Sequence, residues 1–252
     1  MQPDPLTPEG LEPVFAPALP VVREPFWGYL DLVWMIGLLF AGMVVLFGAA
    51  AALLFLHPML RDSAPFLLGI QFLFYGVVYL AFLVIFHFHY GKPVFISLGW
   101  RRSRFHLGIA ALAGMALAFA LQPVLTLLHA PEVKSPVEQF TKTPVSLVLI
   151  ALTAVLAAPL FEELWFRGFL QPLLTRSLGI WPGIIITGIL FGAMHIFEYS
   201  NAWQYGFAIA LVGIALGYVR ARSGSVIPST VMHACFNFMS VIALVATKFA
   251  KH

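Results

Sequence analysis

The chain has 252 residues, of which 61% are hydrophobic and only 10% are charged, and its formal net charge is +3. A typical soluble domain is about half apolar and about a quarter charged, so this composition excludes an ordinary soluble protein. Together with a mean hydropathy of +0.92, it predicts an all-α, polytopic helical membrane protein. The net charge is too small to indicate nucleic acid as a partner. The single cysteine, Cys235, excludes a disulfide within the chain.

The chain begins with a proline-rich segment. Residues 1–26 contain seven of the 18 prolines, together with four acidic residues. Such a composition is typical of a disordered or extended tail. The segment lacks the basic start and apolar core of a signal peptide, so we interpret the first apolar run as a retained membrane helix. Residues 27–252 form the predicted membrane domain.

Seven long apolar runs follow the tail. The predicted spans are residues 27–56, 64–90, 105–129, 145–174, 181–198, 202–220 and 225–247. At a rise of about 1.5 Å per residue, each is long enough, or nearly so, to cross a hydrocarbon core about 30 Å thick. An eighth span is the alternative if the fourth run breaks near residues 176–181. Pro159 predicts a kink within the fourth span.

The loops differ in their content of basic residues. With seven spans, eight lysines and arginines fall on one face of the membrane and five on the other. The positive-inside rule then places the N-terminus in the cytoplasm, although the C-terminal lysines lie on the poorer face. The short loops favour a prokaryotic cell membrane.

The fourth span carries a charged cluster, made of Glu162, Glu163 and Arg167. Each charge at the bilayer centre costs about 2.5–3.5 kcal/mol on insertion scales, so such residues indicate a functional site. Glu163 and Arg167 are four residues apart and share a helical face, whereas Glu162 points about 100° away from Glu163. We therefore predict that Glu163 pairs with Arg167. Glu162 stays free to act as a general base.

Two later spans add polar partners within apolar runs. His195 follows Phe191 by four residues, and we expect Phe191 to pack beside it; His233 and Asn237 share one face of the last span. A carboxylate, two histidines and an amide are enough to activate water and to stabilise an oxyanion. They are equally able to hold zinc through Glu162, His195 and His233, with an open position for water.

Other intramembrane chemistries lack their residues. None of the three aspartates lies deep in a span, which excludes a protease with paired aspartates. The chain has no His-Glu-x-x-His helix of the usual zinc protease.

The three polar motifs resemble those of a known family. Glu162-Glu163-x-x-x-Arg167, Phe191-x-x-x-His195 and His233-x-x-x-Asn237 are similar in order and spacing to the signatures of the CAAX protease and bacteriocin-processing (CPBP, or Abi) family. The resemblance covers residues 145–240, and the sequence Leu98-Gly-Trp-Arg-Arg resembles the loop that often precedes this catalytic core.

The resemblance implies an intramembrane endopeptidase with a water-accessible site. In that family the residues that match Glu162 and His195 activate water, and those that match His233 and Asn237 stabilise the oxyanion. The residues that match Glu163 and Arg167 support the site. Both metal-dependent and metal-free mechanisms have been described for the family. We favour a site without a cofactor, because the Asn237 amide is a poor zinc ligand and a good oxyanion donor.

The expected partners are a peptide or protein substrate and membrane lipid, and no oligomeric state is indicated. Peptides or the termini of membrane proteins are favoured over prenylated substrates. Two other functions remain open at this stage. One is a membrane scaffold or immunity protein without proteolytic activity, and the other is a proton-coupled transporter that uses Glu162 and Glu163 as a relay.

Overall fold

The structure is a computed structural model, and it describes residues 25–133 and 143–249. The described residues form helices joined by loops, and no strand occurs among them. Seven helical segments in this part of the chain are long and apolar enough to cross a membrane. These segments confirm the prediction of an all-α, polytopic helical membrane protein, and their number agrees with the seven-span interpretation.

The spans are made of α-helices with π-helical turns. In chain order they are α1 (Tyr29–Leu56); α2 (Ala64–Phe82) with π-helix η2 (Leu83–His89); α4 (Leu107–Leu127); α6 (Pro144–Leu152), η3 (Thr153–Ala157), α7 (Ala158–Glu163), η4 (Leu164–Leu170) and α8 (Gln171–Leu178) in one continuous span; α9 (Ile180–His195) with η5 (Ile196–Tyr199); α10 (Trp203–Ser223); and α11 (Val226–Phe249). The short helices η1 (Pro58–Asp62) and α3 (Val94–Ser97) lie in loops.

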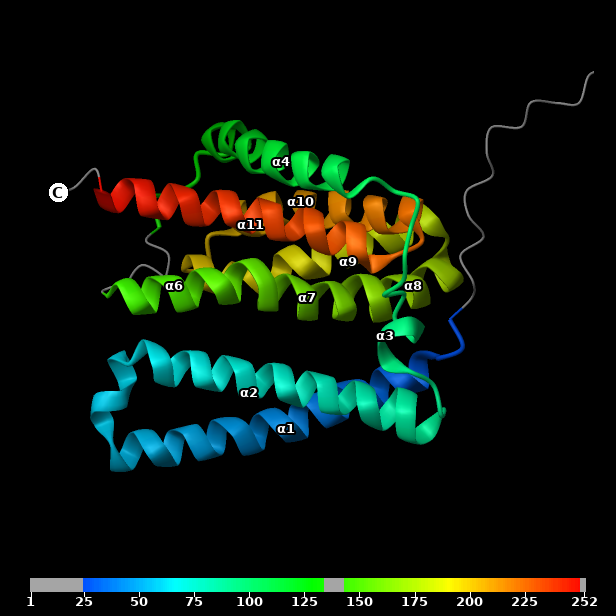
Figure 1. The fold of residues 1–252 in the computed structure, drawn as a ribbon, viewed down its shortest axis with the longest axis horizontal. Helices are drawn as coiled ribbons and strands as arrows, with labels where there is room; N and C mark the ends of the chain where they lie inside the picture. Colours follow the sequence, from blue (N-terminus) through cyan, green and yellow to red (C-terminus); the bar gives the residue numbers. More distant parts are fainter. Residues whose placement is uncertain (1–24, 134–142, 250–252) are drawn as a thin grey trace, which may run out of the picture.

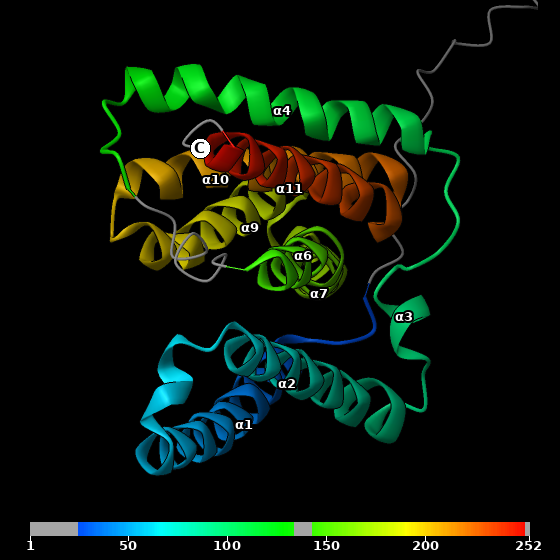
Figure 2. The same ribbon diagram turned by 60° about the vertical axis from the view of Figure 1, so that its left-hand side comes forward.

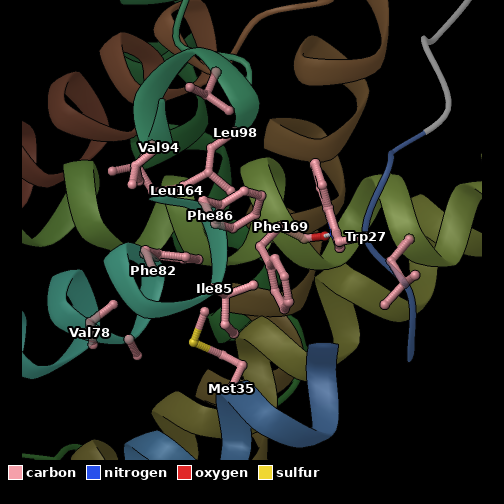
Figure 3. Close-up of a cluster of buried hydrophobic side chains, with 13 residues drawn as sticks. Trp27, Met35, Val78, Phe82, Ile85, Phe86, Val94, Leu98, Leu164 and Phe169 are labelled. Carbon is pink, nitrogen blue, oxygen red and sulfur yellow. Dashed lines mark hydrogen bonds between the residues drawn. The ribbon is translucent and has the colours of Figure 1, made fainter. Parts of the chain in front are cut away.

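The fourth span lies at the centre of the bundle. On one side it faces the antiparallel hairpin of α1 and α2, and on the other side lie α9, α10 and α11, with α4 outermost (Figures 1 and 2). A cluster of buried apolar side chains joins the hairpin to the fourth span, with Phe82 and Phe86 of the second span packed against Phe169 of η4 (Figure 3). Glu163, Arg167 and Gln171 of the fourth span are buried among these helices.

The N-terminal end of the described chain is fastened to this cluster. The Trp27 indole Nε1 donates a hydrogen bond to the Phe169 carbonyl at 3.1 Å, and the two rings are stacked. Asp31 accepts hydrogen bonds from the Gly28 amide and the Tyr90 hydroxyl, at 2.7 and 2.8 Å. The predicted tail lies outside the described residues except for residues 25 and 26. Those two residues already contact the helical domain, because the Pro25 carbonyl accepts from Arg176 and the Phe26 ring meets Trp27.

Trp27→Phe is expected to lower the free energy of unfolding by about 1 kcal/mol. The change leaves the Phe169 carbonyl without its indole donor, and a lost buried hydrogen bond costs about that much. Trp34→Phe is the matched control, because Trp34 lies in the same part of the chain with 62% of its side chain exposed. Thermal unfolding of both variants in detergent measures the difference. Equal effects in the two variants would contradict this anchoring role.

Candidate active site

Glu163 and Arg167 form an ion pair in the interior of the protein. Arg167 Nη1 lies 2.9 Å from Glu163 Oε1, and both side chains are fully buried. Arg167 Nη2 donates to the Gly213 carbonyl of α10 at 2.9 Å, and the guanidinium Cζ lies 4.4 Å from the centre of the Phe191 ring of α9. The predicted pairing of Glu163 with Arg167 is confirmed. The guanidinium therefore connects the fourth span to two other helices.

The buried pair is not completely satisfied. Among the described residues, Glu163 Oε2 and Arg167 Nε have no hydrogen-bond partner. Buried polar groups are nearly always hydrogen-bonded, and the exceptions concentrate where a site has a task besides stability. Because breaking a buried pair leaves a charge without its counterion, either residue alone would be strongly unfavourable at this depth.

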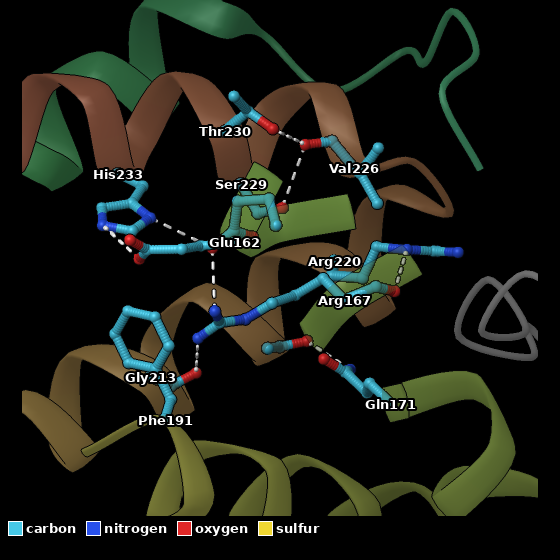
Figure 4. Close-up of polar contacts among 12 residues, drawn as sticks. Glu162, Arg167, Gln171, Phe191, Gly213, Arg220, Val226, Ser229, Thr230 and His233 are labelled. Atoms are coloured by element: carbon cyan, nitrogen blue, oxygen red, sulfur yellow. Dashed lines mark hydrogen bonds and ion pairs between the residues drawn. The ribbon is translucent and has the colours of Figure 1, made fainter. Parts of the chain in front are cut away.

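His233 lies between the two glutamates. Its Nδ1 is 3.3 Å from Glu163 Oε1, and its Nε2 is 3.8 Å from Glu162 Oε2 (Figure 4). Glu163, which is buried, therefore orients the imidazole, in the way that a second carboxylate orients a functional histidine. Glu162 keeps 28% of its side chain exposed. The geometry thus separates a buried, paired carboxylate from an accessible one, as the helical positions predicted.

His195 has its ring fixed from its own helix. Its Nδ1 lies 2.7 Å from the Phe191 carbonyl. A carbonyl only accepts, so Nδ1 carries the proton, and in the neutral ring Nε2 keeps its lone pair. The Phe191 ring contacts both histidines, with centroid distances of 4.6 Å to His195 and 5.5 Å to His233. Phe191 therefore packs beside His195, as expected, and it also links that histidine to His233 and Arg167.

A proline explains where Asn237 points. In π-helix η3 the Ala158 amide donates to Thr153, five residues back. In that register the Ala154 carbonyl would take its hydrogen bond from residue 159, which is a proline without an N–H. Asn237 Nδ2 of α11 supplies the missing donor at 2.8 Å. Pro159 is thus associated with this π-helical turn, and the kink predicted at Pro159 stays a prediction.

The same arrangement recurs in η4. The Gln171 amide donates to Phe166, five residues back, so the Arg167 carbonyl would need an N–H from residue 172, which is again a proline. Arg220 Nε of α10 donates to this carbonyl at 3.1 Å. A side chain from another helix thus completes each π-helical turn on either side of the glutamates, and π-helical turns are frequent at functional sites.

Two further residues near Glu162 were not predicted. The Tyr75 ring of α2 is buried and stacks on Phe161, with centroids 4.6 Å apart. Glu198 of η5 is exposed and interacts electrostatically with both Glu162 and His195. In the sequence Tyr75 is one aromatic among many in an apolar run. The acidic Glu198, three residues after His195, was the one available signal.

The alternative zinc site is not assembled in this conformation. The described residues contain no group of three or more His, Cys, Asp and Glu side chains close enough to hold a metal ion. Glu162 and His233 approach each other, but with His195 they do not form the three-ligand set that a catalytic zinc requires. His233 is instead directed by its two carboxylate neighbours.

Comparison with known proteins agrees with the motifs. Residues 144–239, the part of the chain that carries the glutamates, both histidines, Arg167 and Asn237, match the family model of the type II CAAX prenyl endopeptidase Rce1-like proteins. This segment is therefore similar to the CAAX protease family. The chain is also 32% identical over 124 residues, which are 48% of its length, to an uncharacterized 24.3 kDa protein of Escherichia coli. It spans about half of that relative (52%). No solved structure matches the chain.

Arg167→Ala is expected to lower the free energy of unfolding by about 3–5 kcal/mol, because it leaves Glu163 charged and unpaired in the interior. Arg104→Ala removes an exposed arginine and is the matched control, with an expected change below about 0.5 kcal/mol. Yield and thermal unfolding in detergent measure both variants. A stable Arg167→Ala protein would contradict the structural role of the pair.

A double-mutant cycle tests the link between Pro159 and Asn237. Asn237→Ala should cost about 1 kcal/mol in the natural background, because it leaves the Ala154 carbonyl without a donor. In a Pro159→Ala background residue 159 supplies its own N–H, so the same change should cost less. Unfolding midpoints of the four proteins give the coupling. Identical costs of Asn237→Ala in both backgrounds would show that the proline is not the cause.

Proposed function

We propose that the chain is an intramembrane endopeptidase of the CAAX type, in which Glu162 activates a water molecule. One observation carries the proposal: two adjacent carboxylates, Glu162 and Glu163, have different surroundings. Glu163 is fully buried against Arg167 and His233, whereas Glu162 is partly exposed and lies 3.8 Å from His233 Nε2. An accessible carboxylate beside a positioned histidine is the arrangement expected for general acid–base catalysis.

The chain's own residues account for the proton transfers. Glu162 takes a proton from water while the water oxygen forms a bond to the carbonyl carbon of the scissile peptide. We assign His195 to support of this step, because its Nδ1 is bonded to the Phe191 carbonyl and its Nε2 keeps a lone pair that can accept a hydrogen bond from water. When the tetrahedral intermediate collapses, the C–N bond breaks and Glu162 returns the proton to the leaving amine. The products are a carboxylic acid and an amine, so atoms and charges balance, and the acid then loses its proton to water.

His233 and Asn237 are assigned to the developing negative charge. With Nδ1 turned to Glu163, the Nε2 side of His233 faces the Glu162 side of the site, and in the protonated ring Nε2–H donates to the oxyanion. Asn237 uses one amide hydrogen for the Ala154 carbonyl, and the second hydrogen remains available. One preorganised donor of this kind contributes about 2.7–4 kcal/mol in other hydrolases.

The proposed substrates are peptides or the termini of membrane proteins. The matched family is described as prenyl endopeptidases, but prenylation is not required by the residues described above. The proposed setting is a prokaryotic cell membrane, from the short loops, with a cytoplasmic N-terminus, from the distribution of basic loop residues. Cleavage of a peptide library by the purified protein, followed by mass spectrometry of the products, identifies the substrate class.

The same experiment separates this function from the other two. A scaffold or immunity protein would leave the library intact. A proton-coupled transporter would give proton-dependent uptake into vesicles, also without cleavage. The intact set of glutamate, histidine and asparagine side chains supports hydrolysis over both alternatives.

Glu162→Gln is expected to reduce the rate of cleavage by at least about a hundredfold, because a general base contributes about 10²–10⁴-fold. The folded state should be nearly unchanged, since the substitution keeps the shape of a partly exposed side chain. Glu132→Gln, at an exposed position in the loop after α4, is the matched control and should retain full activity. Cleavage rates and unfolding midpoints are measured together, and an active Glu162→Gln protein would rule out the assignment.

Activity is expected to persist in a strong chelator. The proposed mechanism relies on donors and a base from the protein itself, so metal removal should change neither the cleavage rate nor the melting temperature. Elemental analysis of the purified protein accompanies the assay. Loss of activity that added zinc restores, with one zinc per chain, would instead make Glu162, His195 and His233 the ligands.

A further inference from the structure

One end of the bundle collects arginines without acidic partners. The loop after α3, the end of α8 and the end of α10 meet there, on the side of α3 and α8 in Figure 1. Among the described residues, the ion pairs involve Arg167 and His233 alone. None of the other cations at this end forms an ion pair with a carboxylate of the described residues; they are Lys92, Arg101, Arg102, Arg104, Arg176, Arg220 and Arg222.

Arg220 is the most constrained of these cations. Only 7% of the residue is exposed, and its Nε is fixed by the hydrogen bond to the Arg167 carbonyl (Figure 4). The guanidinium also packs on Gly99, where an added Cβ would lie 2.7 Å from Arg220 Nη2. Neither terminal nitrogen has a hydrogen-bond partner among the described residues. A buried guanidinium with unused donors points to an anion that is bound in the membrane setting.

Arg101 is held beside Arg220 by a network of loop contacts. The Gly99 carbonyl accepts from the Val226 amide at 3.1 Å, and the Arg101 carbonyl accepts from the Ser225 hydroxyl at 2.6 Å. Arg101 Nε donates to the Gly224 carbonyl at 3.0 Å, while its terminal nitrogens stay exposed. The positive charge of Arg101 disfavours that of Arg220, and the buried Glu163 carboxylate offsets part of this repulsion. Two like charges fixed near each other are unfavourable, and an anion bound by both would relieve the remaining repulsion.

We propose that Arg101 and Arg220 bind the phosphate of an anionic glycerophospholipid headgroup. The planar guanidinium presents paired donors that match phosphate oxygens. The site lies where spans end, at the level of lipid headgroups, and basic residues at that level attract anionic lipids. This role is separate from peptide hydrolysis and does not depend on it.

The bound phosphate would act close to the active site. Arg220 reaches the phosphate with its terminal nitrogens and the Arg167 carbonyl with Nε, so the lipid would hold Arg220 in place. Arg220 in turn completes the π-helical turn that carries Arg167. Anionic lipid should therefore raise the thermal stability of the fourth span and with it that of the whole bundle.

The test uses the full chain, purified in a neutral detergent and titrated with a short-chain phosphatidylglycerol. Binding is followed by native mass spectrometry and by thermal unfolding. Arg101→Gln is expected to weaken the apparent Kd at least tenfold, because it removes one of the two guanidinium groups. Arg222→Gln is the matched control; Arg222 is exposed, and it lies two residues beyond Arg220 on another face of α10. Its effect should stay below twofold.

Parallel titrations with inorganic phosphate and with a short-chain phosphatidylcholine identify the source of the phosphate. The proposal expects saturable binding of phosphatidylglycerol and at least tenfold weaker binding of the other two. Equal losses in Arg101→Gln and Arg222→Gln would mean diffuse charge attraction and would overturn the site. Equally tight binding of inorganic phosphate would overturn the lipid assignment. If the Arg220→Gln protein folds, it serves as a second test variant. If it does not fold, the Arg101→Gln result alone decides the outcome.

Discussion

The ion pair of Glu163 with Arg167 is the constraint on which the rest of the structure depends. Both side chains are fully buried in a span that must cross a membrane, and neither is tolerable there without its partner. The pair also needs surroundings that supply further contacts. Gly213 gives a carbonyl, Phe191 gives an aromatic face, and His233 gives a ring nitrogen to Glu163. Helices α9, α10 and α11 are therefore gathered around the fourth span by the requirements of one ion pair.

The two π-helical turns extend this principle to the backbone. Each shifts the hydrogen-bond register by one residue, and each is followed by a proline that has no N–H to offer. The carbonyls left open at Ala154 and Arg167 are satisfied by Asn237 and Arg220. Backbone groups in a bilayer must be paired inside the protein, so these bonds fix the rotation of α10 and α11 relative to the glutamates. The irregular backbone thereby helps to position a residue assigned to catalysis.

The residues around the site do not all come from the segment that matches the family model. Trp27 supports the Phe169 carbonyl in η4, Tyr75 stacks beside Glu162 on Phe161, and Leu98 packs against Gly168. A side chain at residue 168 would meet the Leu98 carbonyl at 2.9 Å, which explains why glycine follows Arg167. The N-terminal hairpin and the loop after α3 therefore pack against the fourth span close to the candidate site.

The sequence by itself determined the class of protein, a number of spans of seven or eight, the pairing of Glu163 with Arg167 and the segment of the chain that carries the candidate site. These features follow from hydropathy and from helical spacing, which are local properties. Only the tertiary structure decided what each side chain contacts across helices. Several contacts depend on how spans far apart in the chain are rotated and packed. They are the position of His233 between two carboxylates, the hydrogen bond from Asn237 to the carbonyl that Pro159 cannot serve, and the placement of Tyr75 and Glu198 near Glu162. That rotation is set by close packing and by the pairing of buried polar groups, neither of which is visible in the periodicity of one span.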